Sequence, residues 1–362
     1  MRAVGLLLAV SACGNSCQKQ DTVQAVACGV SAAPDANGNM PTELYAIVDL
    51  PRIARTRELS GTALDESTHT LYALEDKRPW IVSLVASPTW RTWTLGPRLT
   101  LSYPLALTHG THTGYFEDAW DGEGLVRTSD GSFFVIANER APAVAKFDAH
   151  GVFIEKVEMP EHYSRQAPNK GLESLSLSPD ERYLFTANEG SLLSDGPPAT
   201  KTRGTLVRIL RRELASSKDE EFAYRTEPLG GGKGGDMGVS ELAAISGDDL
   251  LVLERGFQHG YGNTVRVFRV NLAGAKNVID VPSLDDSVVT LEKTLVLDVG
   301  NLQCSGATHR GPERNPVLEN FEAMTIGPVL PDGRRLLFLT SDDNGRSDQV
   351  PRIVIVAVKL HQ

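Results

Sequence analysis

One pattern recurs five times along this chain of 362 residues and restricts its fold more than any other feature. In each copy a glutamate opens a short apolar segment, a turn with an aspartate follows, and a second apolar segment ends on polar residues. The copy GLESLSLSPDERYLFTANEG, at residues 171–190, contains every part of the pattern. Such repeats predict an array of equal structural units. The leading glutamates are Glu58, Glu123, Glu173, Glu241 and Glu322.

The other positions of the repeat also keep their spacing. The turn aspartate lies seven residues after the glutamate in four copies and ten residues after it in the last. These aspartates are Asp65, Asp130, Asp180, Asp248 and Asp332. The polar residues that close the copies are Glu75-Asp76, Asn138-Glu139-Arg140, Asn188-Glu189, Glu254-Arg255 and Asp342-Asp343-Asn344.

Each copy is followed by further segments that are typical of strands. The second strands are predicted at residues 71–74, 133–137, 183–187, 250–253 and 336–340, and third strands follow at 80–85, 143–148, 205–211, 264–271 and 352–359. Fourth strands are predicted at 91–101, 152–159, 221–229 and 294–299. Four-stranded units repeated around an axis are typical of an all-β fold, the β-propeller.

The last unit lacks a fourth strand, and the segment TELYAIVDL at residues 42–50 is a strand without a unit. Joining the two would close the ring and leave no terminal blade exposed. We therefore expect five blades. A sixth is the alternative, because the interval at residues 274–295 is long, although it contains no sixth leading glutamate.

The connectivity predicts which face of the ring carries function. In antiparallel blades the starts of first strands and the ends of second strands lie on one face, which we call the mouth. Long loops at residues 102–122, 160–170, 230–240 and 300–320 reach the same face, whereas tight turns occupy the other. Long loops on a rigid scaffold are where binding and chemistry usually occur.

The repeat also predicts a ring of carboxylates at the mouth. Carboxylates ~6 Å apart repel each other by about 3 kcal/mol per pair at an effective dielectric of 20. A bound cation, basic partners such as Arg140 and Arg255, or raised pKa values would relieve this repulsion. Hard oxygen ligands suit calcium. Alternatively, each glutamate accepts hydrogen bonds from backbone amides of the next blade.

Composition excludes one class of partner. Asp and Glu number 46 against 36 Lys and Arg, which gives a net charge of −10. Nucleic-acid binding requires a basic surface, so we do not expect it.

The N-terminus predicts export. Residues 1–12 contain a seven-residue apolar run, and the segment that ends at Cys13 resembles a bacterial lipobox, which implies lipidation of Cys13. Residues 13–41 are expected to form a lipidated flexible tether, and residues 42–362 the propeller domain. We expect an envelope lipoprotein on the periplasmic side or at the cell surface, attached to the membrane only through its lipid; a plain signal peptide and secretion are the alternative. A disulfide between Cys17 and Cys28 would leave Cys304 free.

The repeats ELSGTALD, DGEGL, GLESLSLSPD, SELAAI and ENFEAMTIGP resemble the phytase-like family described as "esterase-like activity of phytase" across about residues 44–359. The resemblance implies phosphoester hydrolysis by the five leading glutamates. It also implies a second group of acidic residues around them, namely Glu75, Asp76, Glu139, Glu189, Glu254, Asp342 and Asp343.

The resulting hypothesis is an exported, monomeric, calcium-dependent phosphoester hydrolase that acts on a small phosphorylated substrate. The leading glutamates hold calcium together with the acidic residues around them, and Arg140, Arg255 or Lys170 neutralise the phosphate. The alternatives are a non-catalytic binding propeller stabilised by calcium, and a lactonase-like metal-dependent hydrolase.

Overall fold

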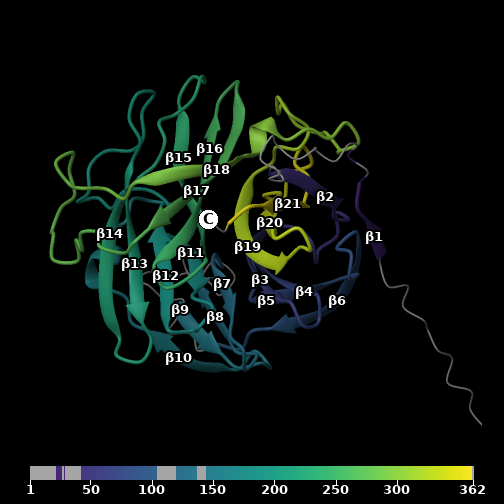
Figure 1. The fold of residues 1–362 in the computed structure, drawn as a ribbon, viewed down its shortest axis with the longest axis horizontal. Helices are drawn as coiled ribbons and strands as arrows, with labels where there is room; N and C mark the ends of the chain where they lie inside the picture. The colour runs from purple at the N-terminus through teal and green to yellow at the C-terminus, as the bar shows by residue number, and fades with distance from the viewer. Residues whose placement is uncertain (1–21, 27, 29–41, 104–119, 137–143, 361–362) are drawn as a thin grey trace, which may run out of the picture.

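The computed structural model describes residues 22–26, 28, 42–103, 120–136 and 144–360, and its strands form five antiparallel sheets around a central axis (Figure 1). The predicted five-bladed β-propeller is confirmed. Blade 1 consists of β3 (Leu59–Asp65), β4 (Thr70–Glu75), β5 (Trp80–Ala86) and β6 (Thr92–Thr100), with β1 (Thr22–Gln24) at its outer edge. Blade 2 consists of β7 (Leu125–Arg127), β8 (Phe133–Ile136), β9 (Val144–Phe147) and β10 (Phe153–Val157).

The other three blades have the same order of strands from the axis outward. Blade 3 consists of β11 (Leu172–Leu177), β12 (Tyr183–Asn188), β13 (Leu206–Glu213) and β14 (Lys218–Arg225). Blade 4 consists of β15 (Gly235–Ala244), β16 (Asp249–Gln258), β17 (Gly262–Asn271) and β18 (Lys293–Asp298). Blade 5 consists of β19 (Phe321–Val329), β20 (Arg335–Ser341), β21 (Arg352–Val358) and β2 (Glu43–Asp49). Two short 3-10 helices, η3 (Glu161–Arg165) and η4 (Val299–Asn301), lie in loops between blades.

Strand β2 closes the ring as predicted. It pairs antiparallel with β21, from Glu43 opposite Ala357 to Asp49 opposite Arg352. Every residue of β21 is buried, because this strand lies inside a sheet whose two faces pack against neighbouring parts of the ring. A continuous apolar strand of this kind is stable only where both faces are covered.

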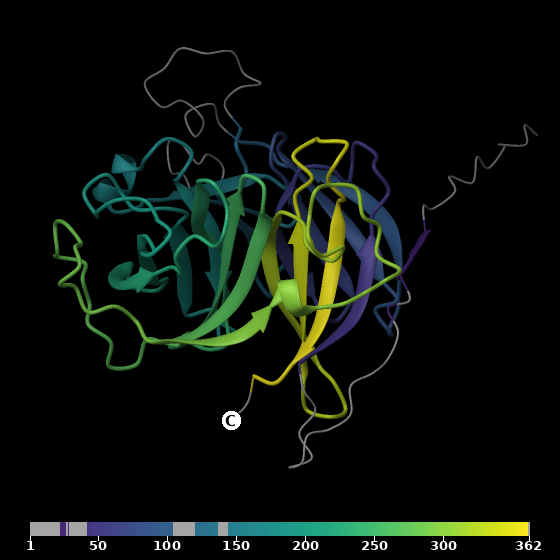
Figure 2. The same ribbon diagram turned by 90° about the horizontal axis from the view of Figure 1, so that it is seen from above.

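The repeated aspartates have a local structural role in the hairpins between first and second strands, on the face of the ring opposite the mouth. Figure 2 shows the ring from the side. Asp65, Asp130, Asp180 and Asp332 each accept a hydrogen bond from the backbone amide two residues later. Aspartate favours such turns because its carboxylate replaces a backbone acceptor. These aspartates therefore define the hairpins between first and second strands and take no part in the mouth.

The N-terminal segment differs from the tether that the sequence predicts. Strand β1 pairs with β6, and Val26 forms a bridge with Ile47. Cys28 forms a disulfide with Cys304, so the predicted Cys17–Cys28 pairing and the free Cys304 are wrong. The apolar side chains of this segment pack against the outer edges of blades 1 and 5, which holds it on the fold. Cys13 and Cys17 lie outside the described residues.

Candidate metal centre at the propeller mouth

An extra residue in the first strand orients the leading glutamates of blades 2, 3 and 5. Glu173 and Glu322 are each the unpaired residue of a β-bulge at the start of their strand. Glu123 lies at the matching position, since both it and Gly124 form backbone hydrogen bonds with Ile136. A bulge re-aims side chains at the end of a strand, and here it directs three carboxylates into one cavity.

The other two leading glutamates lie one residue away from this position, so the predicted ring of five is wrong. In blade 4 the bulged residue is Ser240, and the neighbouring Glu241 is buried. Glu241 Oε1 accepts hydrogen bonds from Leu175 N of the adjacent blade at 3.0 Å and from Leu242 N at 2.9 Å. For this residue the alternative prediction, that a glutamate holds two blades together, is confirmed.

Glu58 also lies outside the cavity lining. It precedes β3 with a φ of 55°, and its amide donates to Asp343 Oδ1 at 3.1 Å. In blade 1 the bulge position belongs to Ser60, whose hydroxyl donates to the Gly122 carbonyl of blade 2 at 2.6 Å. In blades 1 and 4 a serine therefore occupies the bulge position in place of a glutamate, and its hydroxyl donates to a backbone carbonyl of the neighbouring blade.

The mouth contains a cavity of about 700 Å³ in which acidic side chains outnumber basic ones. Its lining comes from the ends of second strands, the starts of first strands and the loops between blades. The acidic residues are Asp76, Asp121, Glu123, Glu173, Glu189, Asp236, Glu313, Glu319, Glu322, Asp342 and Asp348. The basic residues are Lys77, Lys170, Arg255 and Arg346.

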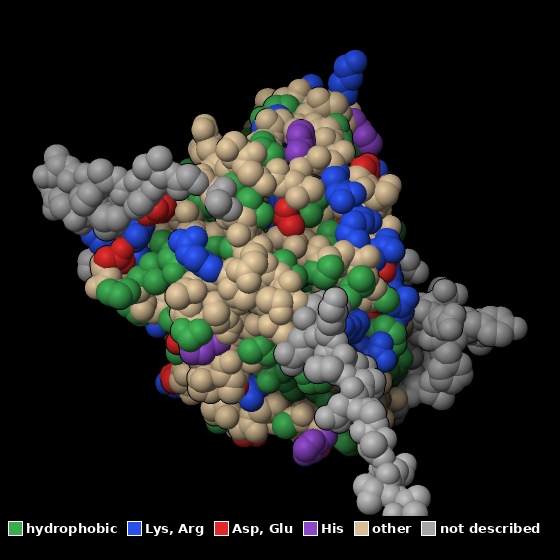
Figure 3. Space-filling view, turned by 90° about the vertical axis from the view of Figure 1, so that its right-hand side faces the viewer, with side chains coloured by type: hydrophobic (Ala, Val, Ile, Leu, Met, Phe, Trp, Pro, Cys, Tyr) green, Lys and Arg blue, Asp and Glu red, His purple; other side chains and the backbone are tan. Residues whose placement is uncertain are grey.

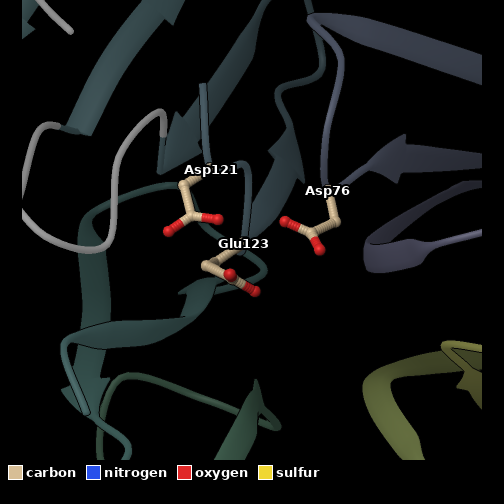
Figure 4. A group of neighbouring side chains, drawn as sticks. All are labelled: Asp76, Asp121 and Glu123. Atoms are coloured by element: carbon tan, nitrogen blue, oxygen red, sulfur yellow. The ribbon is translucent and has the colours of Figure 1, made fainter. Parts of the chain in front are cut away.

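Asp76, Asp121 and Glu123 form the tightest group of carboxylates (Figure 4). One oxygen of each lies within 4.8 Å of an oxygen of the other two. Burial, with the charges of Asp121 and Glu322, raises the pKa of Asp76 to about 7 despite the nearby Lys77 ammonium. Burial and the neighbouring carboxylates also hold the pKa of Glu123 well above its usual range. The site therefore concentrates negative charge that only partly finds a counter-charge.

Asp342, at the end of β20, extends this group. Burial first, and then the charge of Glu322, raises the pKa of Asp342 well above its usual range. The amide of Asn344 donates to Asp342 Oδ1 at 2.7 Å, which fixes the orientation of this carboxylate.

Three basic side chains balance part of the charge. Lys77 Nζ lies 2.8 Å from Asp76 and 2.9 Å from Asp121. The partly buried Arg255 contacts Glu189 at 3.2 Å and Glu322 at 3.1 Å. Burial alone would lower the pKa of Arg255, but these carboxylates outweigh it and raise the pKa. Lys170 contacts Glu189 at 2.6 Å.

The other residues that the sequence assigns to the site do not line the cavity or lie outside the described part of the chain. Glu75 pairs with Arg78 at 2.9 Å, and Glu254 accepts from Tyr224 at 2.5 Å and from Lys293 at 2.6 Å. The buried Asp343 does not line the cavity, and its carboxylate lies 3.3 Å from Arg52 and 3.5 Å from Arg57. Glu139 and Arg140 lie outside the described residues.

Five acidic residues of the lining were missed by the repeat pattern. Asp121 precedes Glu123 by two positions, and side chains two apart on an extended chain share a face, so the motif DGEG contained the signal. Asp236, Glu313, Glu319 and Asp348 come from loops or strand starts outside the repeat, and no comparable signal exists for them.

The donor set suits a hard divalent cation. Among the described residues that line the cavity there is no histidine or cysteine, and carboxylate and amide oxygens predominate. Calcium takes six to eight oxygen ligands, whereas softer metals prefer nitrogen or sulfur. Asp76, Asp121 and Glu123 would hold the ion, with Glu322 and Asp342 close enough to affect the charge of this group.

Comparisons with known proteins agree with this architecture. The family model "Phytase-like: Esterase-like activity of phytase" matches residues 54–345. No curated protein matches the chain by sequence. No helix in the described part of the chain has the length and apolarity needed to cross a membrane.

Several solved structures are similar. An endo-arabinase from Bacteroides thetaiotaomicron has a TM-score of 0.46 and 11% identity, with 85% of this chain and 96% of that chain covered. A luciferin-regenerating enzyme has a TM-score of 0.38 and 11% identity, covering 86% and 94%. A protein from Lactobacillus plantarum has a TM-score of 0.38 and 16% identity, covering 83% and 74%.

Proposed function

The chain belongs to the phytase-like family, and from that premise we propose that it is a calcium-dependent phosphoester hydrolase acting in the cavity at the propeller mouth. The observation that carries the proposal is the carboxylate group of Asp76, Asp121 and Glu123, whose oxygens lie within 4.8 Å of one another. Carboxylates this close repel each other and raise the free energy of the folded state unless a cation lies between them. We infer a bound cation because it would offset this repulsion.

Calcium bound there would polarise a phosphoryl oxygen and lower the pKa of a coordinated water. Lys77 pairs with two of the same carboxylates, so calcium and the Lys77 ammonium compete for them. The side chain of Lys77 is 55% exposed, which allows its ammonium to leave the carboxylates and meet an anionic substrate.

Lys170 and Arg255 reduce the repulsion between an acidic cavity and a phosphate. Both contact Glu189, and Arg255 also contacts Glu322, so the wall they form is less negative than the wall of the carboxylate group. A substrate phosphate would lie between this wall and the metal, where positive charge stabilises the transition state. Arg140, to which the sequence assigns the same role, lies outside the described residues.

Hydrolysis of phosphomonoesters and phosphodiesters by the purified protein tests the proposal. We expect turnover in calcium, loss of turnover in chelator, and loss in the Glu123→Gln variant even with calcium. Glu241→Gln is the matched control, because Glu241 is a leading glutamate outside the cavity lining whose carboxylate accepts hydrogen bonds from two backbone amides. Absence of turnover with calcium present would refute the hydrolase.

A non-catalytic propeller stabilised by calcium is the second candidate. The observation that favours it is that Lys77, Lys170 and Arg255 already form ion pairs within the cavity. For this candidate we expect calcium to raise the melting temperature while no ester is hydrolysed.

We also propose export and lipidation at Cys13. The disulfide between Cys28 and Cys304 supports export, because such bonds persist in oxidising compartments. Mass spectrometry of the protein isolated from membranes should detect the lipid, and Cys13→Ala should release the protein into the soluble fraction. A membrane-bound Cys13→Ala variant would contradict lipid anchoring.

A further inference from the structure

A basic surface borders the mouth on the outer side of blades 1 and 5. We call it the arginine strip, and its members are Arg52, Arg55, Arg57, Arg78, Arg98 and Arg346. Three of them lie in the segment PRIARTRE before β3. Figure 3, which faces the side of the ring that carries β1 and β6, shows Lys and Arg side chains gathered in a band.

Contacts between neighbouring members make the strip continuous. Arg52 donates to the backbone carbonyl of Arg346, and Arg57 donates to that of Gly345 in the same loop. Arg55 Nη1 lies 3.3 Å from the Gly96 carbonyl in β6, two residues before Arg98. The strip therefore crosses from the β20–β21 loop of blade 5 to β6 of blade 1.

Trp80 organises the end of the strip in blade 1. The Arg98 guanidinium lies 3.4 Å from the centroid of the indole ring, and that of Arg78 lies 4.9 Å from it. Stacking on an aromatic face fixes the plane of a guanidinium while leaving its N–H groups at the edge. Fixed guanidinium planes suit bidentate contacts with phosphate oxygens.

The negative charges near the strip lie mostly beneath it. Asp343, which contacts Arg52 and Arg57, has a side chain with no exposed area. Glu75, which pairs with Arg78, is 1% exposed. The exceptions are Glu58, which is partly buried, and Asp348, which pairs with Arg346 and has a side chain that is 43% exposed. The outward surface is thus positive on a protein with a net charge of −10.

The strip reaches the cavity through Arg346, which lines it and pairs with Asp348 at 2.7 Å. We propose that the arginine strip binds a chain of linked phosphate groups and holds it with one end at the cavity. The span from Arg346 to Arg98 offers contacts for several phosphates in a row, more than one small phosphoester could use. This inference rests on the proposed function, of which it defines the substrate class.

Titration with a medium-length inorganic polyphosphate, in chelator so that no turnover occurs, tests the binding surface. Inorganic phosphate and vesicles of anionic lipid serve as the other two probes. We expect the polyphosphate to bind and inorganic phosphate to bind far more weakly. Arg98→Gln should weaken polyphosphate binding about fivefold.

Arg91→Gln is the matched control. Arg91 is also an exposed arginine stacked on an aromatic ring, at 4.8 Å from the centroid of Tyr45, but it precedes β6 at the end away from the mouth. Equal weakening by Arg91→Gln, unchanged binding by Arg98→Gln, or binding to vesicles without binding to polyphosphate would each overturn the inference. If the strip binds polyphosphate as expected but the protein hydrolyses no phosphoester, the proposed hydrolase function is refuted and the inference about binding stands.

Discussion

Replacing Glu123 by glutamine should stabilise the protein without calcium and remove the effect of calcium. Two carboxylates within 4.8 Å each repel Glu123 by about 3.5 kcal/mol at an effective dielectric of 20. If Glu123 instead retains a proton in the folded state, its raised pKa also lowers the unfolding free energy at neutral pH. Because Lys77 and solvent offset much of either cost, we expect Glu123→Gln to gain about 2 kcal/mol of unfolding free energy in chelator.

Calcium should remove the stability difference between the two proteins. At a calcium concentration 100 times the dissociation constant, a single site adds about 2.7 kcal/mol to the unfolding free energy of the wild type. The variant has lost a ligand of the carboxylate group and should gain less than about 1 kcal/mol.

Denaturant unfolding, in chelator and in calcium, measures both effects. The control Glu241→Gln should keep the full calcium increment, because Glu241 accepts hydrogen bonds from amides away from the cavity. A Glu123→Gln variant that is less stable in chelator and gains as much from calcium as the wild type would refute the electrostatic argument.

Three further perturbations follow from the structure. Arg255→Met should lower the unfolding free energy by about 2 kcal/mol, because it removes the ion-pair partner of Glu322 and leaves the buried Glu189 with Lys170 alone. Arg266→Met, at a partly exposed pair with Asp298, should cost less than about 1 kcal/mol, and equal losses in denaturant unfolding would contradict this reasoning. Replacing both Cys28 and Cys304 by alanine should cost about 4 kcal/mol, seen as a lower melting temperature that reducing agent no longer changes; a melting temperature equal to that of the oxidised wild type would argue against the bond. Burial raises the pKa of Glu319 to about 7 from 4.5, so its protonated form stabilises the fold at low pH and this contribution is lost as pH rises through 7. In chelator at pH 8, Glu319→Gln should therefore be about 2 kcal/mol more stable than the wild type, and a variant with unchanged pH dependence would show that Glu319 titrates normally.

The number of blades could be predicted because its signals are local. Turn aspartates such as Asp130 and Asp180 bind amides two residues away, so spacing alone identifies each hairpin. The strand at residues 43–49 was assigned to the last blade because one blade lacked a strand and one strand lacked a blade.

The site depended on single-residue shifts that a sequence pattern does not reveal. Glu173 and Glu241 look equivalent in the repeat, yet the bulge falls on Glu173 in one blade and on Ser240 in the other. Backbone pairing with the second strand decides this position, and pairing is a property of the folded sheet. The bond between Cys28 and Cys304 was missed for a similar reason, since 276 residues separate them.

Closure of blade 5 has a consequence for biosynthesis. Residues 43–49 are made before their partner strand, residues 352–358, and the first four blades lie between them in the sequence. Strand β2 must therefore wait until four blades have been made before it can pair with β21, which makes ring completion a late event in the folding of the propeller. A polypeptide truncated before residue 352 would expose two unpaired sheet edges and should aggregate rather than persist as a smaller propeller.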